Sequence, residues 1–159
     1  MSVEKVRNYL ASFGADQRIL EFDVSSATVA LAAEALGCEP CRIAKSLALT
    51  TPDGPVLVVA AGDAKIDNQG FRAQFNTKAK MLSPEDTLAQ IGHAVGGVCP
   101  FAVNDGVRVY LDESLKRFDT VFPACGSSNS AIELTIPELE RYSRSLGWVD
   151  VCKGWGEEA

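Results

Sequence analysis

The stretch from Arg42 to Thr50 reads Arg-Ile-Ala-Lys-Ser-Leu-Ala-Leu-Thr, an apolar strand pattern that contains a single lysine. Successive side chains of a strand alternate between its two faces, so Lys45 is predicted to share a face with Ile43, Leu47 and Leu49. A lysine is rarely buried without a partner. Lys45 therefore either reaches solvent near the strand end or supplies a positioned cation in a cleft.

A tight turn and a second strand follow this stretch. Residues 51–55, Thr-Pro-Asp-Gly-Pro, combine proline, which presets one backbone angle, with glycine, which accepts positive φ. Residues 56–61 are continuously apolar, as expected of an interior strand covered on both faces. We therefore predict a hairpin in which this second strand pairs with the strand that contains Lys45.

Helix signals alternate with the remaining strand candidates. Asp67 and Ser83 can cap helices, and Thr135 with Glu138 matches a capping box. Further short strands are expected at residues 78–82, 107–111, 120–124 and 131–134. Short strands among helices, several of them joined by hairpin-length turns, favour a mixed sheet with flanking helices. We predict one α+β domain over residues 1–159, with a mixed, largely antiparallel sheet.

The composition is that of a folded soluble protein, with 47% hydrophobic and 23% charged residues. No apolar run has the length needed to span a bilayer, and the amino-terminal residues lack a signal-peptide pattern. Five cysteines, an odd number, make a disulfide framework unnecessary. We expect a cytoplasmic protein with reduced thiols and no membrane contact, present as a monomer or a weak dimer.

The net charge of −6 argues against indiscriminate binding of nucleic acid, so DNA is not an expected partner. A local basic patch is still compatible with this charge. The densest cluster of basic residues consists of Lys65, Arg72, Lys78 and Lys80, and a second consists of Lys116 and Arg117. These residues either form a nucleic-acid contact or belong to a solvated surface of mixed charge.

A glycine-rich loop is predicted at residues 92–101, Gly-His-Ala-Val-Gly-Gly-Val-Cys-Pro-Phe. The adjacent Gly96 and Gly97 allow backbone to approach a ligand closely, and Pro100 stiffens the exit from the loop. The loop lacks the lysine and hydroxyl residue that complete a P-loop, so nucleoside triphosphate binding is disfavoured. A plain long turn is the alternative interpretation.

Two cysteine patterns suggest other chemistry. Cys38 and Cys41 have dithiol spacing, but the chain has no second pair and only one histidine, so neither zinc nor redox chemistry is favoured. Cys99 with His93 could act as a thiol nucleophile and its base, although free cysteines are more often small buried hydrophobes. No metal site or cofactor motif is recognised.

Several of these motifs together resemble the YbaK family, which is akin to the editing domain inserted in bacterial prolyl-tRNA synthetase. The resemblance covers about residues 25–134. It is carried by the helix at 29–36, the run Ile-Ala-Lys-Ser-Leu at 43–47, Gly62-Asp63, the Leu-Ser-Pro-Glu helix entry at 82–85, and the Gly-Gly-Val-Cys-Pro-Phe run at 96–101. The resemblance implies a free-standing hydrolase that removes a wrong amino acid, such as alanine, cysteine or serine, from tRNA for proline.

The resemblance also implies roles for individual residues. The lysine at the position of Lys45 is functionally essential in the family, and the loop with Gly96, Gly97 and Pro100 positions the ester carbonyl through backbone groups. We expect the remaining substrate contacts from His93, Val98, Gly126, Ser127 and Asn129.

The expected partner is mischarged tRNA, contacted through Lys65, Arg72, Lys78 and Lys80, and prolyl-tRNA synthetase is a candidate protein partner. Two other functions stay open. One is a thiol enzyme that uses Cys99 and His93, and the other is a non-catalytic module that binds tRNA or protein on the same fold.

Overall fold

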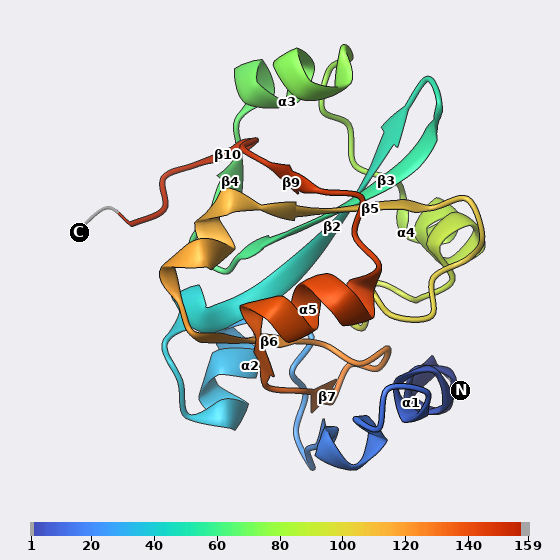
Figure 1. Ribbon diagram of the computed structural model, residues 1–159, viewed down its shortest axis with the longest axis vertical. Coiled ribbons are helices and arrows are strands. Elements are labelled where there is room, and N and C mark those ends of the chain that lie inside the picture. Colours follow the sequence, from blue (N-terminus) through green and yellow to red (C-terminus); the bar gives the residue numbers. More distant parts are fainter. Residues whose placement is uncertain (1, 157–159) are drawn as a thin grey trace.

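The computed structural model describes residues 2–156. Its centre is a curled six-stranded sheet with the strand order β8-β6-β2-β3-β5-β9 (Figure 1). The strands of this sheet are β2 (Ile43–Thr51), β3 (Gly54–Ala61), β5 (Arg108–Asp112), β6 (Thr120–Pro123), β8 (Leu134–Thr135) and β9 (Trp148–Val149).

The predicted hairpin is confirmed as β2 and β3, which pair in antiparallel fashion at eight positions from Ala44↔Ala61 to Thr51↔Gly54. The side chains of β3 from Val56 to Ala61 are completely buried, as expected of an interior strand. Parallel pairing joins β2 to β6, β3 to β5 and β5 to β9, whereas β6 and β8 are antiparallel. The α+β class with a mixed sheet is therefore confirmed, and its longest ladder is antiparallel.

Two small sheets and nine helical segments complete the fold of residues 2–156. The small antiparallel sheets pair β1 (Leu20–Glu21) with β7 (Ser130–Ala131), and β4 (Lys65–Ile66) with β10 (Cys152–Lys153). The helical segments of the described residues are α1 (Ser2–Ala11), η1 (Asp16–Arg18), α2 (Val29–Leu36), η2 (Pro40–Arg42), α3 (Asn68–Phe75), α4 (Pro84–Asp86), the π-helical turn η3 (Thr87–Ile91), η4 (Glu113–Arg117) and α5 (Ile136–Ser143).

The predicted helix starts are confirmed by side-chain caps. Asp67 accepts a hydrogen bond from the Gln69 amide at the start of α3, and Ser83 accepts one from Asp86 at the start of α4. Thr135 forms the predicted capping box at the start of α5. These caps satisfy amides that have no partner inside the helix, so local sequence fixes where each helix begins.

The sheet separates two hydrophobic cores. Figure 1 shows α3 on one side of the sheet and α1 and α5 on the other. Leu57 and Val59 of β3 belong to the core with α1 and α5, whereas Val56 and Val58 belong to the core beside α3. This division follows the alternation of side chains along a strand.

Two local expectations were wrong. Residues 78–82 form no strand, and only Met81 makes an isolated bridge to Leu49. The expected strand at 131–134 is divided between β7 and β8, which pair with different strands. Ile43, at the start of β2, packs with Phe122 in a small cluster beside α2.

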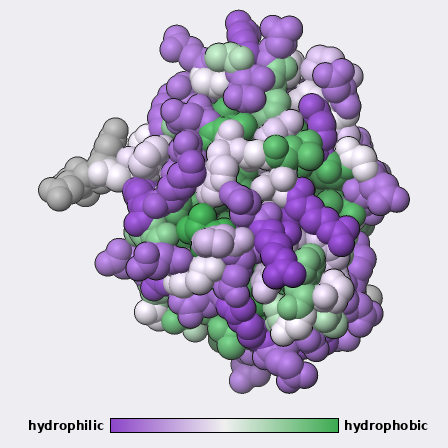
Figure 2. All heavy atoms as spheres, viewed as in Figure 1, coloured by the Kyte–Doolittle hydropathy of each residue, from purple (hydrophilic) through white to green (hydrophobic). Residues whose placement is uncertain are grey.

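Figure 2 shows a largely hydrophilic face on which hydrophobic residues form separate small patches. In the described part of the chain, no helix combines the length and apolar character required to cross a membrane.

Candidate active site

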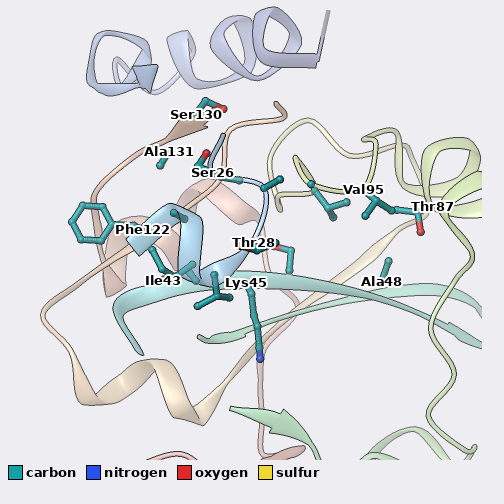
Figure 3. A pocket seen from close by; sticks show the side chains of 18 of the residues that line it. Ser26, Thr28, Ile43, Lys45, Ala48, Thr87, Val95, Phe122, Ser130 and Ala131 are labelled. Atoms are coloured by element: carbon teal, nitrogen blue, oxygen red, sulfur yellow. The ribbon is translucent and has the colours of Figure 1, made fainter. Parts of the chain in front are cut away.

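An open cavity of about 390 Å³ lies at the edge of β2 (Figure 3). Its walls come from β2, the start of α2, the segment that leads into α4 and η3, the glycine-rich loop, and the strands β6 and β7. The lining residues are Ser26, Ala27, Thr28, Val29, Ala32, Ile43, Ala44, Lys45, Ser46, Ala48, Met81, Leu82, Pro84, Thr87, Val95, Gly96, Val98, Phe122, Ala124, Ser130 and Ala131.

The cavity lies beside a break in the pairing along one edge of β2. At one end of β2, β6 pairs with Ile43 and Ala44 only. At the other end, the Leu82 amide donates to the Ala48 carbonyl at 2.9 Å, in the segment that precedes α4. Ser46 lies between these contacts and has no strand partner on this edge within residues 2–156. Small side chains on β2 leave room for a ligand beside this gap.

Five hydroxyl groups line the cavity, and four of them have partners within the protein. Ser26 Oγ donates to Ser128 O (3.3 Å), Thr28 Oγ1 accepts from Leu31 N (3.2 Å), Thr87 Oγ1 donates to Ser83 O (2.8 Å), and Ser127 Oγ is 2.7 Å from Ser130 Oγ. Ser46 Oγ is buried and has no hydrogen-bond partner within residues 2–156. Ser46 is therefore the hydroxyl that is left to bind a ligand or a water.

The glycine-rich loop forms one wall of the cavity. Gly96 and Val98 line it, whereas Gly97 is buried against the turn at Gly126. A Cβ atom on Gly97 would lie 2.7 Å from the Gly126 carbonyl carbon, so no larger residue fits without moving the loop. The Gly97 amide donates to the Ala94 carbonyl at 3.0 Å. The amides of Gly96 and Val98 have no acceptor among the described residues.

His93 and Cys99 lie behind this loop and are completely buried. His93 Nε2 is 2.7 Å from the Phe101 carbonyl oxygen, so this nitrogen carries the proton and cannot serve as a base for Cys99. Burial raises the pKa of the Cys99 thiol to about 12 and lowers the pKa of His93. A thiol that is neutral at pH 7 and out of reach of solvent is a poor nucleophile, so the geometry opposes the thiol-enzyme alternative.

Lys45 adjoins the cavity, but its ammonium group lies outside it. Figure 3 shows the side chain extending away from Ser26, Thr87, Val95 and Ser130. Lys45 Nζ is 3.4 Å from the Gly62 carbonyl oxygen, and burial lowers the pKa of this lysine. The cation is therefore held beside the polypeptide backbone on the other side of β2.

The other predicted substrate contacts form a supporting layer. Gly126 is buried with a φ of 91°, and Asn129 Nδ2 donates to the Phe22 carbonyl oxygen at 3.0 Å. Pro100 is buried and lines a separate polar cleft beside Tyr9. Of the nine predicted catalytic and substrate-binding residues, the structure places Lys45, Gly96 and Val98 on the cavity, and places His93, Gly97, Pro100, Gly126, Ser127 and Asn129 behind it.

Several lining residues were not predicted from the sequence. The polar residues before α2 look like helix caps, and Thr28 does cap α2, which conceals their second position on the cavity wall. Ser46 could have been found, since it follows Lys45 and alternation places it on the opposite face of the strand. Thr87 and Ser130 carry no sequence signal, because their contribution depends on tertiary contacts.

The two basic clusters differ in their contacts. Lys65, Arg72, Lys78 and Lys80 are exposed and have no ion-pair partner within residues 2–156. Lys116 forms an ion pair with Glu113 at 2.6 Å, and Arg117 binds Asp63 through both terminal nitrogens. In the described region, no group of three or more His, Cys, Asp or Glu residues is placed to hold a metal ion.

Residues 23–142 match the sequence model of the family described as the aminoacyl-tRNA editing domain. This match covers about three quarters of the chain and contains the whole cavity wall. The chain belongs to this family.

Two relatives and one solved structure illustrate the relationship. The "Uncharacterized protein YwhH" of Bacillus subtilis is 54% identical over 156 residues, which are 98% of this chain and 99% of that protein. The proline–tRNA ligase of Thermosipho melanesiensis is 30% identical over 125 residues, which are 78% of this chain but only 22% of the ligase. The crystal structure of a candidate trans-editing enzyme for prolyl-tRNA synthetase superimposes with a TM-score of 0.86 at 27% identity, covering 96% of this chain and 98% of that one.

Proposed function

We propose that this protein is a free-standing deacylase that hydrolyses the ester bond of mischarged tRNA, and that its substrate is tRNA for proline carrying a small wrong amino acid. The observation that carries the proposal is the cavity beside the unpaired edge of β2, in a chain that belongs to the editing-domain family. The cavity has small side chains on its floor and a glycine-rich loop on its wall. Such a site suits a small aminoacyl group attached to a large nucleotide.

In this proposal the ester carbonyl lies against the glycine-rich loop. The free amides of Gly96 and Val98 are the candidate donors to the carbonyl oxygen, on which negative charge develops in the transition state. Gly97 supports them by packing on the turn at Gly126. An ester of this kind is already activated, so positioning it beside a water molecule contributes more than strong acid or base catalysis.

Ser46 and Lys45 have different tasks in this mechanism. The unpartnered hydroxyl of Ser46 points to a role in binding a polar atom of the aminoacyl group or the attacking water. The Lys45 ammonium extends away from the glycine-rich loop wall and lies against the Gly62 carbonyl oxygen, so we assign it electrostatic positioning of the terminal adenosine nucleotide, whose only anionic group is its phosphate. A fixed ammonium suits a phosphate as a point charge.

The cavity wall favours alanine over serine as the amino acid removed. Most lining side chains are apolar, and four of the five hydroxyls already have protein partners. A serine side chain would add a hydroxyl with few free partners, and the cost of an unpaired polar group is about 1–3 kcal/mol. A cysteinyl ester should be hydrolysed at a rate between those of the alanyl and seryl esters, because a thiol is a weaker hydrogen-bonding group than a hydroxyl.

The test is single-turnover hydrolysis of tRNA for proline charged separately with alanine, cysteine, serine and proline. We expect hydrolysis of the alanyl ester to be fastest and the prolyl ester to persist. If the protein binds the tRNA but hydrolyses none of the esters, it is a non-catalytic tRNA-binding module on the same fold. If the seryl ester is hydrolysed fastest, the assignment of alanine as the substrate would be overturned, but the deacylase activity would be supported.

A further inference from the structure

The small sheet formed by β4 and β10 places two lysines directly opposite each other. The antiparallel register pairs Lys65 with Lys153, and Ile66 with Cys152. Cys152 is buried in the core beside α3, and Ile66 packs against the same core. Directly opposed residues project from the same face of an antiparallel pair, so the two lysines face outward together, and both are exposed.

This arrangement is unfavourable unless an anion is present. Like charges that are directly opposed across two strands destabilise the pairing. Within residues 2–156, neither lysine has a carboxylate at ion-pair distance. The sequence offers many acidic residues, with 21 aspartates and glutamates against 15 lysines and arginines, yet none of the described ones neutralises this pair. The pair is therefore available to an external anion.

The basic side chains of the protein divide into those that contact another group of the described chain and those that do not. Ten of the 15 lysines and arginines contact a carboxylate, a carbonyl, a hydroxyl or an aromatic ring of the described chain. The five that make no such contact are Lys65, Arg72, Lys78, Lys80 and Lys153. Four of these lie on β4, on α3 and in the segment between α3 and α4, and Lys153 joins them through strand pairing.

The position of this lysine pair relative to the cavity suits a ligand that continues from the cavity. Lys45 Nζ is 3.4 Å from the carbonyl oxygen of Gly62, and Lys65 begins β4 three residues further along the chain, so the lysine pair lies on the side of β2 toward which the Lys45 ammonium extends. Figure 3 shows that the Lys45 side chain extends away from the cavity walls. A nucleic acid whose terminal residue enters the cavity would carry its next phosphates past Lys45 toward the lysine pair.

We propose that Lys65 and Lys153 together form a phosphate-binding contact for the backbone of the tRNA. This inference rests on the proposed function. It adds a residue from the segment after residue 142, which lies outside the family match, and so assigns a substrate contact to the carboxyl-terminal part of the chain. RNA is favoured over an acidic protein because its phosphates are regularly spaced, and the unpaired cations extend over several elements.

The experiment measures binding of uncharged tRNA by fluorescence anisotropy over a series of salt concentrations, with wild type, Lys65→Ala, Lys153→Ala and Lys153→Glu. Lys116→Ala is the matched control, because it removes the same charge from a lysine that already has an acidic partner. Each alanine variant should weaken binding and reduce the salt slope by about one, whereas Lys116→Ala should leave both close to wild type.

Lys153→Glu separates a binding role from a structural one. This change creates an opposite-charge pair with Lys65, so the melting temperature should hold or rise while tRNA binding weakens by about tenfold. Wild-type affinity and salt slope in this variant would overturn the inference, as would absence of tRNA binding by the wild type. The binding assay does not depend on hydrolysis. If the wild type binds tRNA through these lysines but hydrolyses no ester, the proposed deacylase activity would be refuted and the phosphate contact would stand.

Discussion

The two faces of strand β2 have opposite characters. On the cavity face, Ala44, Ser46 and Ala48 are small, and the Ser46 hydroxyl has no hydrogen-bond partner within residues 2–156. On the other face, Leu47 and Leu49 belong with the core beside α3, and Lys45 holds its ammonium against a backbone carbonyl. In the proposed mechanism, the aminoacyl group and the charged nucleotide would therefore be recognised on separate sides of one strand.

This separation has a physical advantage. An ammonium inside the cavity would attract water and favour polar amino acids, whereas an apolar floor favours a small apolar one. A cation on the far face can still attract phosphate, because its charge is only partly screened at short range. Selectivity and affinity can therefore be changed independently, and mutations on the two faces should have different signatures.

The largest effect on the cavity face is expected from Gly97→Val. The added side chain would collide with the backbone at Gly126 and displace the loop, which should reduce hydrolysis by about a hundredfold or more and lower stability by about 1–3 kcal/mol. Ala94→Val adds bulk to an exposed position of the same loop and should be nearly neutral. Wild-type turnover by the Gly97 variant would remove the loop from the site.

A smaller effect is expected from filling the cavity with Ala27→Leu. Ala27 is exposed yet lines the cavity, so its replacement should leave the fold intact while excluding substrate, with a loss in kcat/KM of about tenfold. The control is Ala30→Leu, an exposed position on α2 that is not part of the cavity wall. Equal losses in both variants would indicate a disturbed helix. A fully active Ala27 variant would contradict the assignment of the cavity.

Ser46→Ala should affect activity without harming the fold. Removal of a buried hydroxyl that has no hydrogen-bond partner in the described part of the chain should leave the melting temperature unchanged or higher. Loss of one neutral hydrogen bond to substrate or water should slow hydrolysis by up to about tenfold. If hydrolysis and the melting curve both match wild type, the Ser46 hydroxyl has no role in substrate binding or catalysis.

Cys99→Ala should have the smallest effect on catalysis. The thiol is buried and neutral, so hydrolysis should change by less than about threefold, while the lost side-chain contacts cost about 1 kcal/mol of stability. A hundredfold loss by a folded variant would restore the thiol-enzyme alternative. Alkylation of the native protein gives a second reading, since this buried thiol should react only on unfolding.

The parts of the structure that depend on local chemistry could be predicted from the sequence. The β2–β3 hairpin follows from its turn residues and the apolar run, and the helix starts at Asp67 and Ser83 follow from their caps. The glycine-rich loop could be located, but its division between Gly96 on the cavity and Gly97 behind it depends on packing against the turn at Gly126. Alternation placed Lys45 correctly beside Leu47 and Leu49, without showing that the cavity would lie on the opposite face.

The carboxyl-terminal strands could not be predicted for a different reason. β9 and β10 contain two residues each, which is too short for any periodic pattern. They form because β5 and β4 offer free edges. The hydroxyls of Ser26 and Ser130 meet at the cavity from segments about a hundred residues apart, so only the folded chain reveals them. The pairing that brings Lys153 opposite Lys65 likewise becomes visible only in the folded chain.

The most direct test of the separation across β2 is single-turnover hydrolysis by wild type and Lys45→Ala, with two substrates that differ in phosphate. One is alanyl-tRNA for proline, and the other is an alanyl ester of adenosine, which carries no phosphate. Lys45→Ala should melt like wild type, lose about a hundredfold on the tRNA and retain most of its activity on the nucleoside ester. Equal losses on both substrates would place the ammonium at the reacting carbonyl, and full activity on the tRNA would leave Lys45 without a role; either result would contradict the account.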